Sequence, residues 1–293
     1  MATIEEIIYQ MRQMKEEEFA ILSYLEKYFT RFRITPIKTI QDTFDIPKKS
    51  LDKYITEIVK KKLVSIKKVP YDGLILKPLG LDILSIKDLV DRNIIDSFGN
   101  KIGVGKESDV YEALDPHGSK VSIKIYRIGK SSFKDVIKKR RYLQERNKNT
   151  WMVRNIKSAK REYEIMKKLS NANVSVPKPL AISNHILVME YLDGEIVANS
   201  RRVEKPEIIF EETIDVIKNA YGLGVINSDL SSFNVFVTKY GKVFVIDWPQ
   251  WTSSTSQNAN EKLKSDVINL YEYFNRRFSI NRDINQIINY IQN

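Results

Sequence analysis

The chain has 293 residues, a hydrophobic fraction of 42% and a net charge of +11. This length suits one large or two medium domains with real cores, while the lack of cysteine and the presence of only two histidines exclude disulfides and Cys/His zinc sites. The first residues lack a basic region and an apolar core, and no run of about 18 apolar residues occurs. We therefore expect a cytoplasmic protein without a membrane partner.

Apolar residues recur at helical spacing through roughly the first 90 residues. They predict short amphipathic helices, including one over 37–44 and one that begins at Pro47, followed by two strands, 63–67 and 74–76. Helices followed by a two-stranded hairpin predict a winged helix-turn-helix domain over residues 1–82. The exposed face of the helix after Pro47 is rich in lysine, which makes Lys48, Lys49 and Lys53 candidates for nucleic-acid contact. A protein-docking role is the alternative.

A helical linker is predicted over 83–97, and a β-rich segment follows it. Its strands are expected at 101–105, 109–113 and 121–125, and two more at 180–182 and 186–191 follow a helix that includes 159–169. The remainder reads as mainly helical, apart from a hairpin over 235–246.

Positive charge is concentrated in one region. Residues 124–170 contain 16 Lys or Arg against 4 Asp or Glu, a local excess of 12, so the rest of the chain is close to neutral. One interpretation is a flexible, solvated loop over 128–150. The other is a surface that binds RNA, with Lys138, Lys139, Arg140 and Arg141 as contact candidates.

The strongest chemical signal is the stretch from Asn227 to Asn234, followed by Asp247 at the end of a β-rich run. An Asp, an Asn five residues later and a second Asp form the set that phosphoryl transfer from ATP requires. We expect Asp229 to orient or deprotonate a nucleophile. Asn234 and Asp247 are expected to bind the metal, with Asp247 also acting in catalysis.

Residues upstream complete this pattern. A loop between two predicted strands supplies nucleotide-binding candidates, and its spacing matches the kinase glycine-rich loop rather than a Walker A loop: Gly103, Val104, Gly105, Lys106, Glu107, Ser108 and Val110. Lys124 is the candidate for binding the phosphates and a catalytic residue. Its partner is Glu162 or Glu164, which point about 200° apart on a helix, so that only one can face inward. Met189, Glu190 and Leu192 are expected to bind adenine as a hinge.

Together these motifs resemble the RIO family of atypical protein kinases, and within it the second subfamily, which carries an N-terminal winged helix. The likeness rests on Gly103-Val-Gly-Lys-Glu-Ser-Asp-Val-Tyr111, Gly129-Lys-Ser-Ser-Phe133, Asp229-Leu-Ser231 with Asn234, and Ile246-Asp-Trp-Pro-Gln250. It implies an α+β fold in which the winged helix-turn-helix precedes a trimmed two-lobed kinase-like domain, with an N-lobe over 98–192 and a C-lobe over 193–293.

The resemblance also implies ATP with Mg²⁺ or Mn²⁺, Glu162 as the partner of Lys124, and autophosphorylation at Ser131 or Ser132. The family aspartate equivalent to Asp247 can itself accept the phosphoryl group. The implied partners are the immature small ribosomal subunit with its rRNA, and ribosomal or assembly proteins.

The chain departs from the family pattern at two positions. Asn227 stands where His is usual, which puts the rigidity of the loop in question, and Trp248 stands where Phe is usual and should still pack as an apolar plug. Asp266 resembles the aspartate that braces the catalytic loop. Only 18 residues separate it from Asp247, which leaves no room for an activation loop and a peptide platform, so a conventional peptide substrate is not expected.

We expect an ATP- and magnesium-dependent kinase that acts largely as an ATPase switch in maturation of the small ribosomal subunit. One alternative is a kinase-like pseudoenzyme that serves as an RNA- or ribosome-binding module. The other is a serine kinase that acts on a ribosomal partner.

Overall fold

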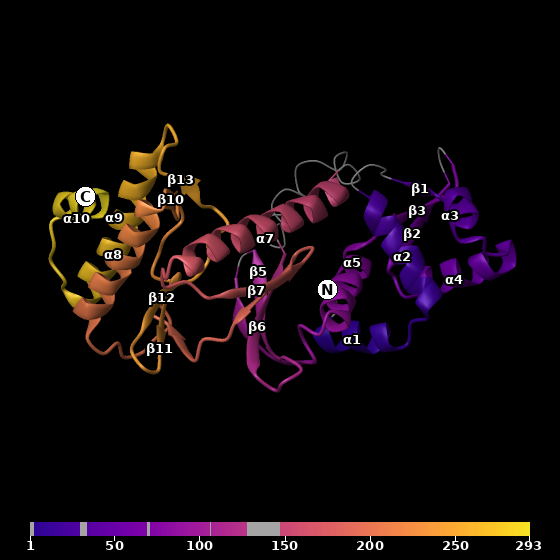
Figure 1. The fold of residues 1–293 in the computed structure, drawn as a ribbon, viewed down its shortest axis with the longest axis horizontal. Coiled ribbons are helices and arrows are strands. Elements are labelled where there is room, and N and C mark those ends of the chain that lie inside the picture. The colour runs from indigo at the N-terminus through magenta and orange to yellow at the C-terminus, as the bar shows by residue number, and fades with distance from the viewer. Residues whose placement is uncertain (1–2, 30–33, 69–70, 106, 128–146) are drawn as a thin grey trace. The chain divides into compact units, whose positions relative to one another are not determined.

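The computed structural model describes residues 3–29, 34–68, 71–105, 107–127 and 147–293, coloured in Figure 1. The chain divides into two compact units. Unit 1 comprises Met1–Ala159 with Ala181–Leu187, and unit 2 comprises Lys160–Leu180 with Val188–Asn293. No helix in the described ranges is long and apolar enough to span a bilayer.

Unit 1 begins with a winged helix. Its helices are α1 (Ile4–Arg12), α2 (Glu16–Tyr28), α3 (Ile37–Phe44) and α4 (Lys48–Lys60), and its sheet has the order β1-β3-β2, formed by β1 (Thr35–Pro36), β2 (Val64–Lys67) and β3 (Gly73–Leu76). The predicted hairpin is confirmed. It gains a third strand because Thr35 and Pro36 pair with Leu74 and Gly73.

Local sequence explains where α3 and α4 end and begin. Asp45 adopts the left-handed conformation at φ 49°, which ends α3, and Pro47 is the N-cap residue of α4 with φ −54° and ψ 135°. The helix thus begins at Lys48, one residue later than predicted. Leu51, Ile55 and Ile58 lie on its buried face, and each contributes roughly 1.5–3 kcal/mol through burial.

Helix α5 (Pro78–Asp91) follows the winged helix and is continuously buried from Gly80 to Ile86. It begins before the linker predicted over 83–97. It also ends before the end of that linker, because Asn93 takes the left-handed conformation at φ 54°. A Cβ on Gly80 would lie 2.7 Å from the carbonyl oxygen of Leu63. Glycine therefore allows α5 to approach the backbone of Leu63, which directly precedes β2.

The larger sheet has the order β4-β5-β6-β8-β7. Its strands are β4 (Ser97–Val104), β5 (Ser108–Leu114), β6 (Lys120–Tyr126), β7 (Pro179–Ser183) and β8 (Ile186–Glu190), and α7 (Asn147–Asn171) precedes β7. Because β6 is central, six of its seven residues are buried. Helix α7 begins at Asn147, inside the range 128–150 that was expected to be loop. The division between the units falls within α7, β7 and β8.

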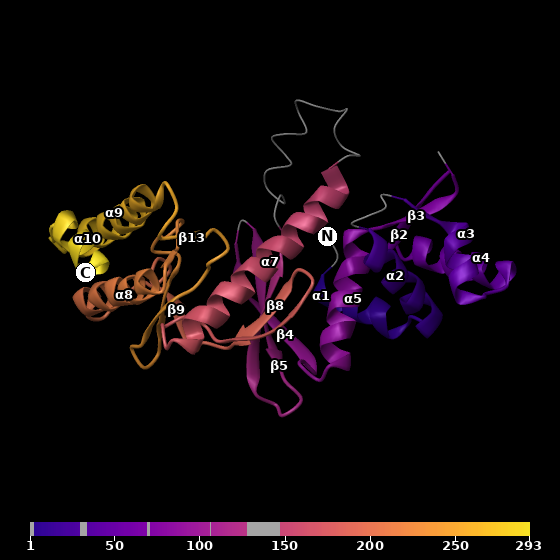
Figure 2. The same cartoon turned by 45° about the horizontal axis from the view of Figure 1, so that its top comes forward.

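Unit 2 contains two small sheets and three packed helices. The sheets are β12-β11-β9 and β10-β13, from β9 (Gly194–Ile196), β10 (Val225–Ile226), β11 (Val235–Thr238), β12 (Val243–Val245) and β13 (Thr252–Ser253). The helices α8 (Pro206–Gly222), α9 (Ala259–Phe278) and α10 (Ile284–Gln292) lie side by side (Figures 1 and 2). Phe210 and Phe274 pack between α8 and α9 with ring centroids 5.4 Å apart. The predicted hairpin over 235–246 is confirmed.

Candidate active site

In unit 1, three nucleotide-binding candidates lie next to one another across three strands. Val110 on β5 pairs with Gly103 on β4 and with Lys124 on β6. The turn between β4 and β5 is closed by the N–H of Gly105, which donates to the carbonyl oxygen of Ser108 at 2.8 Å. Register therefore places the glycine-rich turn directly beside the strand that carries the lysine.

Lys124 is 6% exposed, and its Nζ lies 5.3 Å from the ring centroid of Tyr126. Burying an ammonium group is costly unless anionic or polar groups face it. A lysine on a central strand beside a glycine-rich turn is therefore suited to bind phosphate oxygens.

In unit 2, the loop that carries the catalytic candidate Asp229 is held by two buried residues. Asn227 donates from Nδ2 to the carbonyl oxygen of Asp247 at 2.9 Å and accepts the N–H of Asp229 at 3.2 Å. The carboxylate of Asp266 accepts the N–H of Ser228 at 2.7 Å and of Leu230 at 3.0 Å. Asp266 thus braces the loop as predicted, and Asn227 ties the loop to Asp247, the residue predicted to bind the metal.

Burial raises the pKa of Asp266 to about 6, with a smaller contribution in the same direction from Asp229. The two N–H groups and Lys262 oppose this shift without cancelling it. Protonation of this brace therefore begins close to neutral pH.

Two residues of the site adopt left-handed backbone conformations. Ser228 has φ 70° and Asp247 has φ 84°, angles that cost energy for residues other than glycine. Such conformations persist where surrounding contacts impose them, and here Asp266 and Asn227 provide those contacts. Asp229 and Asp247 are both exposed, which is compatible with the roles predicted for them.

Asn234 is buried, and its Oδ1 accepts the N–H of Ser231 at 2.7 Å and the Ser231 hydroxyl at 2.9 Å. Two donors occupy both lone pairs of an amide oxygen. Metal binding by this oxygen therefore requires the Ser231 hydroxyl to rotate away. Hard oxygen donors such as the Asn234 amide and the Asp247 carboxylate suit Mg²⁺. Within the described ranges, no group of three or more His, Cys, Asp or Glu side chains is arranged to hold a metal ion.

Packing distinguishes the two candidate glutamates on α7. Glu162 is 0% exposed, whereas the Glu164 side chain is 62% exposed and pairs with Lys160 at 3.8 Å. Glu162 accepts the N–H of Trp248 at 2.7 Å. It therefore fixes the peptide that directly follows Asp247.

Trp248 is 1% exposed and donates from Nε1 to the carbonyl oxygen of Val245 at 2.9 Å. The apolar plug expected at this position is confirmed. Arg161, a residue that sequence reasoning missed, donates to the carbonyl oxygen of Trp251 and lies 5.0 Å from its ring centroid. Neighbouring residues of α7 thus hold both ends of the segment after Asp247.

The predicted hinge residues Met189, Glu190 and Leu192 are half-buried at and after the end of β8. The N–H of Glu190 donates to the carbonyl oxygen of Lys178 at 2.9 Å. An adenine contact by Glu190 would therefore use its carbonyl oxygen.

The winged-helix candidates Lys48, Lys49 and Lys53 are all exposed on α4. Several other predicted residues lie outside the described ranges: Lys106, Ser131, Ser132, Lys138, Lys139, Arg140 and Arg141.

Comparison with known proteins agrees with this architecture. The model of the RIO domain matches residues 109–290, more than half of the chain. The chain is 31% identical over 277 residues to the serine/threonine-protein kinase rio2 of Schizosaccharomyces pombe, covering 94% of this chain and 80% of that protein. The chain therefore belongs to the RIO family of serine/threonine protein kinases.

The N-terminal domain defines the subfamily. The model of the Rio2 N-terminal region matches residues 11–92, so the chain is a member of the Rio2 subfamily. It is 33% identical over 222 residues to the RIO-type serine/threonine-protein kinase Rio2 of Methanocaldococcus jannaschii, covering 72% of this chain and 82% of that one. The crystal structure of the Rio2 kinase–ADP/Mg²⁺–phosphoaspartate complex from Chaetomium thermophilum superposes with a TM-score of 0.83 at 28% identity, covering 95% and 87% of the two chains. The predicted α+β fold is confirmed.

Proposed function

We propose that the chain transfers the γ-phosphoryl group of ATP, with Asp247 as a phosphoryl acceptor, and works largely as an ATPase switch. The observation that supports this most directly is the double restraint on Asp247. Asn227 holds its carbonyl oxygen at 2.9 Å and Glu162 holds the next N–H at 2.7 Å. Preorganised groups of this kind lower a barrier because they need no rearrangement during the reaction.

Each residue has a role in this proposal. Lys124 binds phosphate oxygens, and the glycine-rich turn from Gly103 to Ser108 lies against them. Asn234 and Asp247 would hold magnesium, which would supply positive charge against the phosphates. Asp229 orients a water molecule or a serine hydroxyl and accepts its proton.

When a carboxylate oxygen of Asp247 is the nucleophile, it forms a bond to the γ-phosphorus while the bond to ADP breaks, and no proton moves. Water then attacks the phosphorus of this acyl phosphate and returns the free carboxylate. The phosphoaspartate in the Chaetomium thermophilum complex supports such an acceptor in a relative.

Labelling with γ-³²P-ATP tests the chemistry. Asp229→Ala and Asp247→Ala should each abolish turnover while circular dichroism remains that of the wild type. Asp215→Ala, an exposed change on α8, is the matched control and should label normally. A phosphate that hydroxylamine releases places the label on Asp247, whereas an acid-stable label points to Ser131 or Ser132. Full labelling in both site variants would contradict the proposal.

We propose that the physiological setting is maturation of the small ribosomal subunit, bound near its rRNA. The exposed lysines of α4 support this, because basic groups on one helix face release counterions when they bind phosphate. Ultraviolet crosslinking to rRNA should weaken when Lys48, Lys49 and Lys53 are changed to Glu. Turnover that rises with immature subunits, but not with generic proteins, would distinguish the switch from a general serine kinase. Unchanged crosslinking together with turnover indifferent to subunits would refute this setting.

A further inference from the structure

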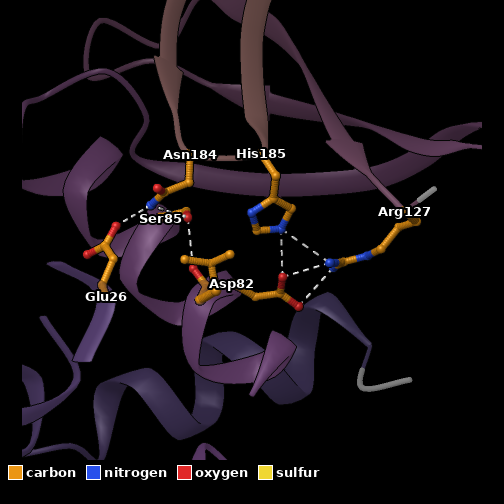
Figure 3. Close-up of polar contacts among 7 residues, drawn as sticks. Glu26, Asp82, Ser85, Arg127, Asn184 and His185 are labelled. Atoms are coloured by element: carbon orange, nitrogen blue, oxygen red, sulfur yellow. Dashed lines mark hydrogen bonds and ion pairs between the residues drawn. The ribbon is translucent and has the colours of Figure 1, made fainter. Parts of the chain in front are cut away.

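A buried ionic cluster of Asp82, Arg127 and His185 lies in unit 1 (Figure 3). The guanidinium of Arg127 donates two bonds to the carboxylate of Asp82, at 2.6 and 2.9 Å. His185 Nε2 lies 2.8 Å from the same carboxylate and 3.3 Å from Arg127 Nη1. Each of the three residues is at most 6% exposed.

The three residues come from separate elements. Asp82 is on α5, Arg127 directly follows β6, and His185 occupies the turn between β7 and β8. Burial raises the pKa of Asp82, but the opposite effect of Arg127 and His185 is larger, so the pKa lies below its ordinary value. A buried, ionised pair with bidentate geometry tolerates little displacement, because moving one partner leaves a charge without compensation.

Arg127 also reaches the glycine-rich turn. Its backbone N–H donates to the carbonyl oxygen of Glu107 at 2.5 Å, one residue before Ser108. Arg127 is three residues beyond Lys124 on the same stretch of chain. Through its side chain it is fixed to α5, and through its backbone it fixes one end of the turn.

Helices α2 and α5 make a second attachment to the sheet close by. Asn184, which precedes His185 in the same turn, donates from Nδ2 to Glu26 Oε1 at 2.5 Å and to Ser85 Oγ at 3.1 Å. The N–H of Tyr126 donates to the carbonyl oxygen of His185 at 3.0 Å. Helices α2 and α5 are therefore bonded to the sheet at the end where the glycine-rich turn is anchored.

We propose that Arg127 is a positioning residue for the nucleotide phosphates, and that Asp82 and His185 hold it in place. Helices α2 and α5 thereby set the position of the glycine-rich turn, and so the affinity for the di- or triphosphate. This inference rests on the proposed binding of ATP at that turn. Adenosine, which has no phosphates, should be insensitive to the cluster.

The test measures dissociation constants of the full chain for Mg·ADP and for adenosine by calorimetry. Asp82→Asn and Arg127→Lys should each raise the dissociation constant for Mg·ADP at least fivefold and change that for adenosine less than twofold. Lysine cannot replace the bidentate contact that Arg127 makes. His185→Gln keeps a donor toward Asp82 and should bind Mg·ADP like the wild type, whereas His185→Leu should not. Asp91→Asn, an exposed change on the same helix, is the control.

Where a single variant fails to fold, the pair Asp82→Leu with Arg127→Met removes both charges without leaving either alone. It should show the same selective loss. Equal losses for both ligands, or wild-type affinity in Asp82→Asn and Arg127→Lys, would overturn the inference. A wild-type chain that binds adenosine but not Mg·ADP would overturn the proposed function as well.

Discussion

Replacing Asn227 with alanine tests the brace between the catalytic loop and Asp247. The change deletes a bond of 2.9 Å to the carbonyl oxygen of Asp247 and one of 3.2 Å from the N–H of Asp229. A neutral hydrogen bond is worth about 1 kcal/mol, so the two together amount to about 2 kcal/mol. If the whole loss falls on the transition state, the rate drops roughly 30-fold.

Single-turnover labelling with γ-³²P-ATP measures this rate, and urea unfolding measures the accompanying loss of stability. Asn227→His replaces the amide with the residue usual in the family, keeps a donor for the carbonyl oxygen, and should recover about half of the lost free energy. Asn260→Ala, which removes a surface bond to Gln292, is the control and should change neither quantity. A rate in Asn227→Ala within twofold of the wild type would refute the brace.

Two further predictions follow from unit 2. Glu162→Gln weakens a charge-assisted hydrogen bond to the N–H of Trp248 and should slow labelling by roughly five- to tenfold. Glu164→Gln changes an exposed side chain and should leave the labelling rate unaltered. Equal rates for the two variants would contradict the role that the packing of α7 gives to Glu162. Since the pKa of Asp266 is raised from 3.8 to about 6, the folded chain binds a proton that the unfolded chain does not. Binding of this proton by Asp266 adds about 3 kcal/mol to the free energy of unfolding below about pH 4. This contribution is lost as the pH rises through 6. The difference in unfolding free energy between wild type and Asp266→Asn should therefore shift in favour of the wild type toward pH 4, and parallel urea profiles from pH 4 to 8 would rule this out.

Local patterns in the sequence predict most of the helices and strands. The spacing of Leu51, Ile55 and Ile58 predicts α4, and the turn ending at Gly73 predicts the hairpin of β2 and β3. Element ends are less certain, because a single residue decides them. Asn93 ends α5 before the predicted position through its left-handed conformation.

Long-range contacts lie beyond such patterns. Asp82 and Arg127 are 45 positions apart, and His185 is 103 positions from Asp82, so no spacing links them. Helical periodicity shows that Glu162 and Glu164 face apart, but only packing against Trp248 shows which one is buried. Motifs identify the residues of the candidate site, while contacts such as Arg161 with Trp251 depend on the folded chain.

The backbone at Asp247 restricts which residues can occupy that position. A φ of 84° is tolerated by glycine and, among residues with side chains, chiefly by asparagine and aspartate. Glutamate would preserve the charge but fit this angle poorly, whereas asparagine would fit the angle and lose the charge. If Asp247 carries the proposed chemistry, a change of Asp247 to asparagine would therefore preserve the backbone conformation and abolish that chemistry. The fold of a distant relative therefore says little about its activity, and the side chain at the position of Asp247 is the more informative feature.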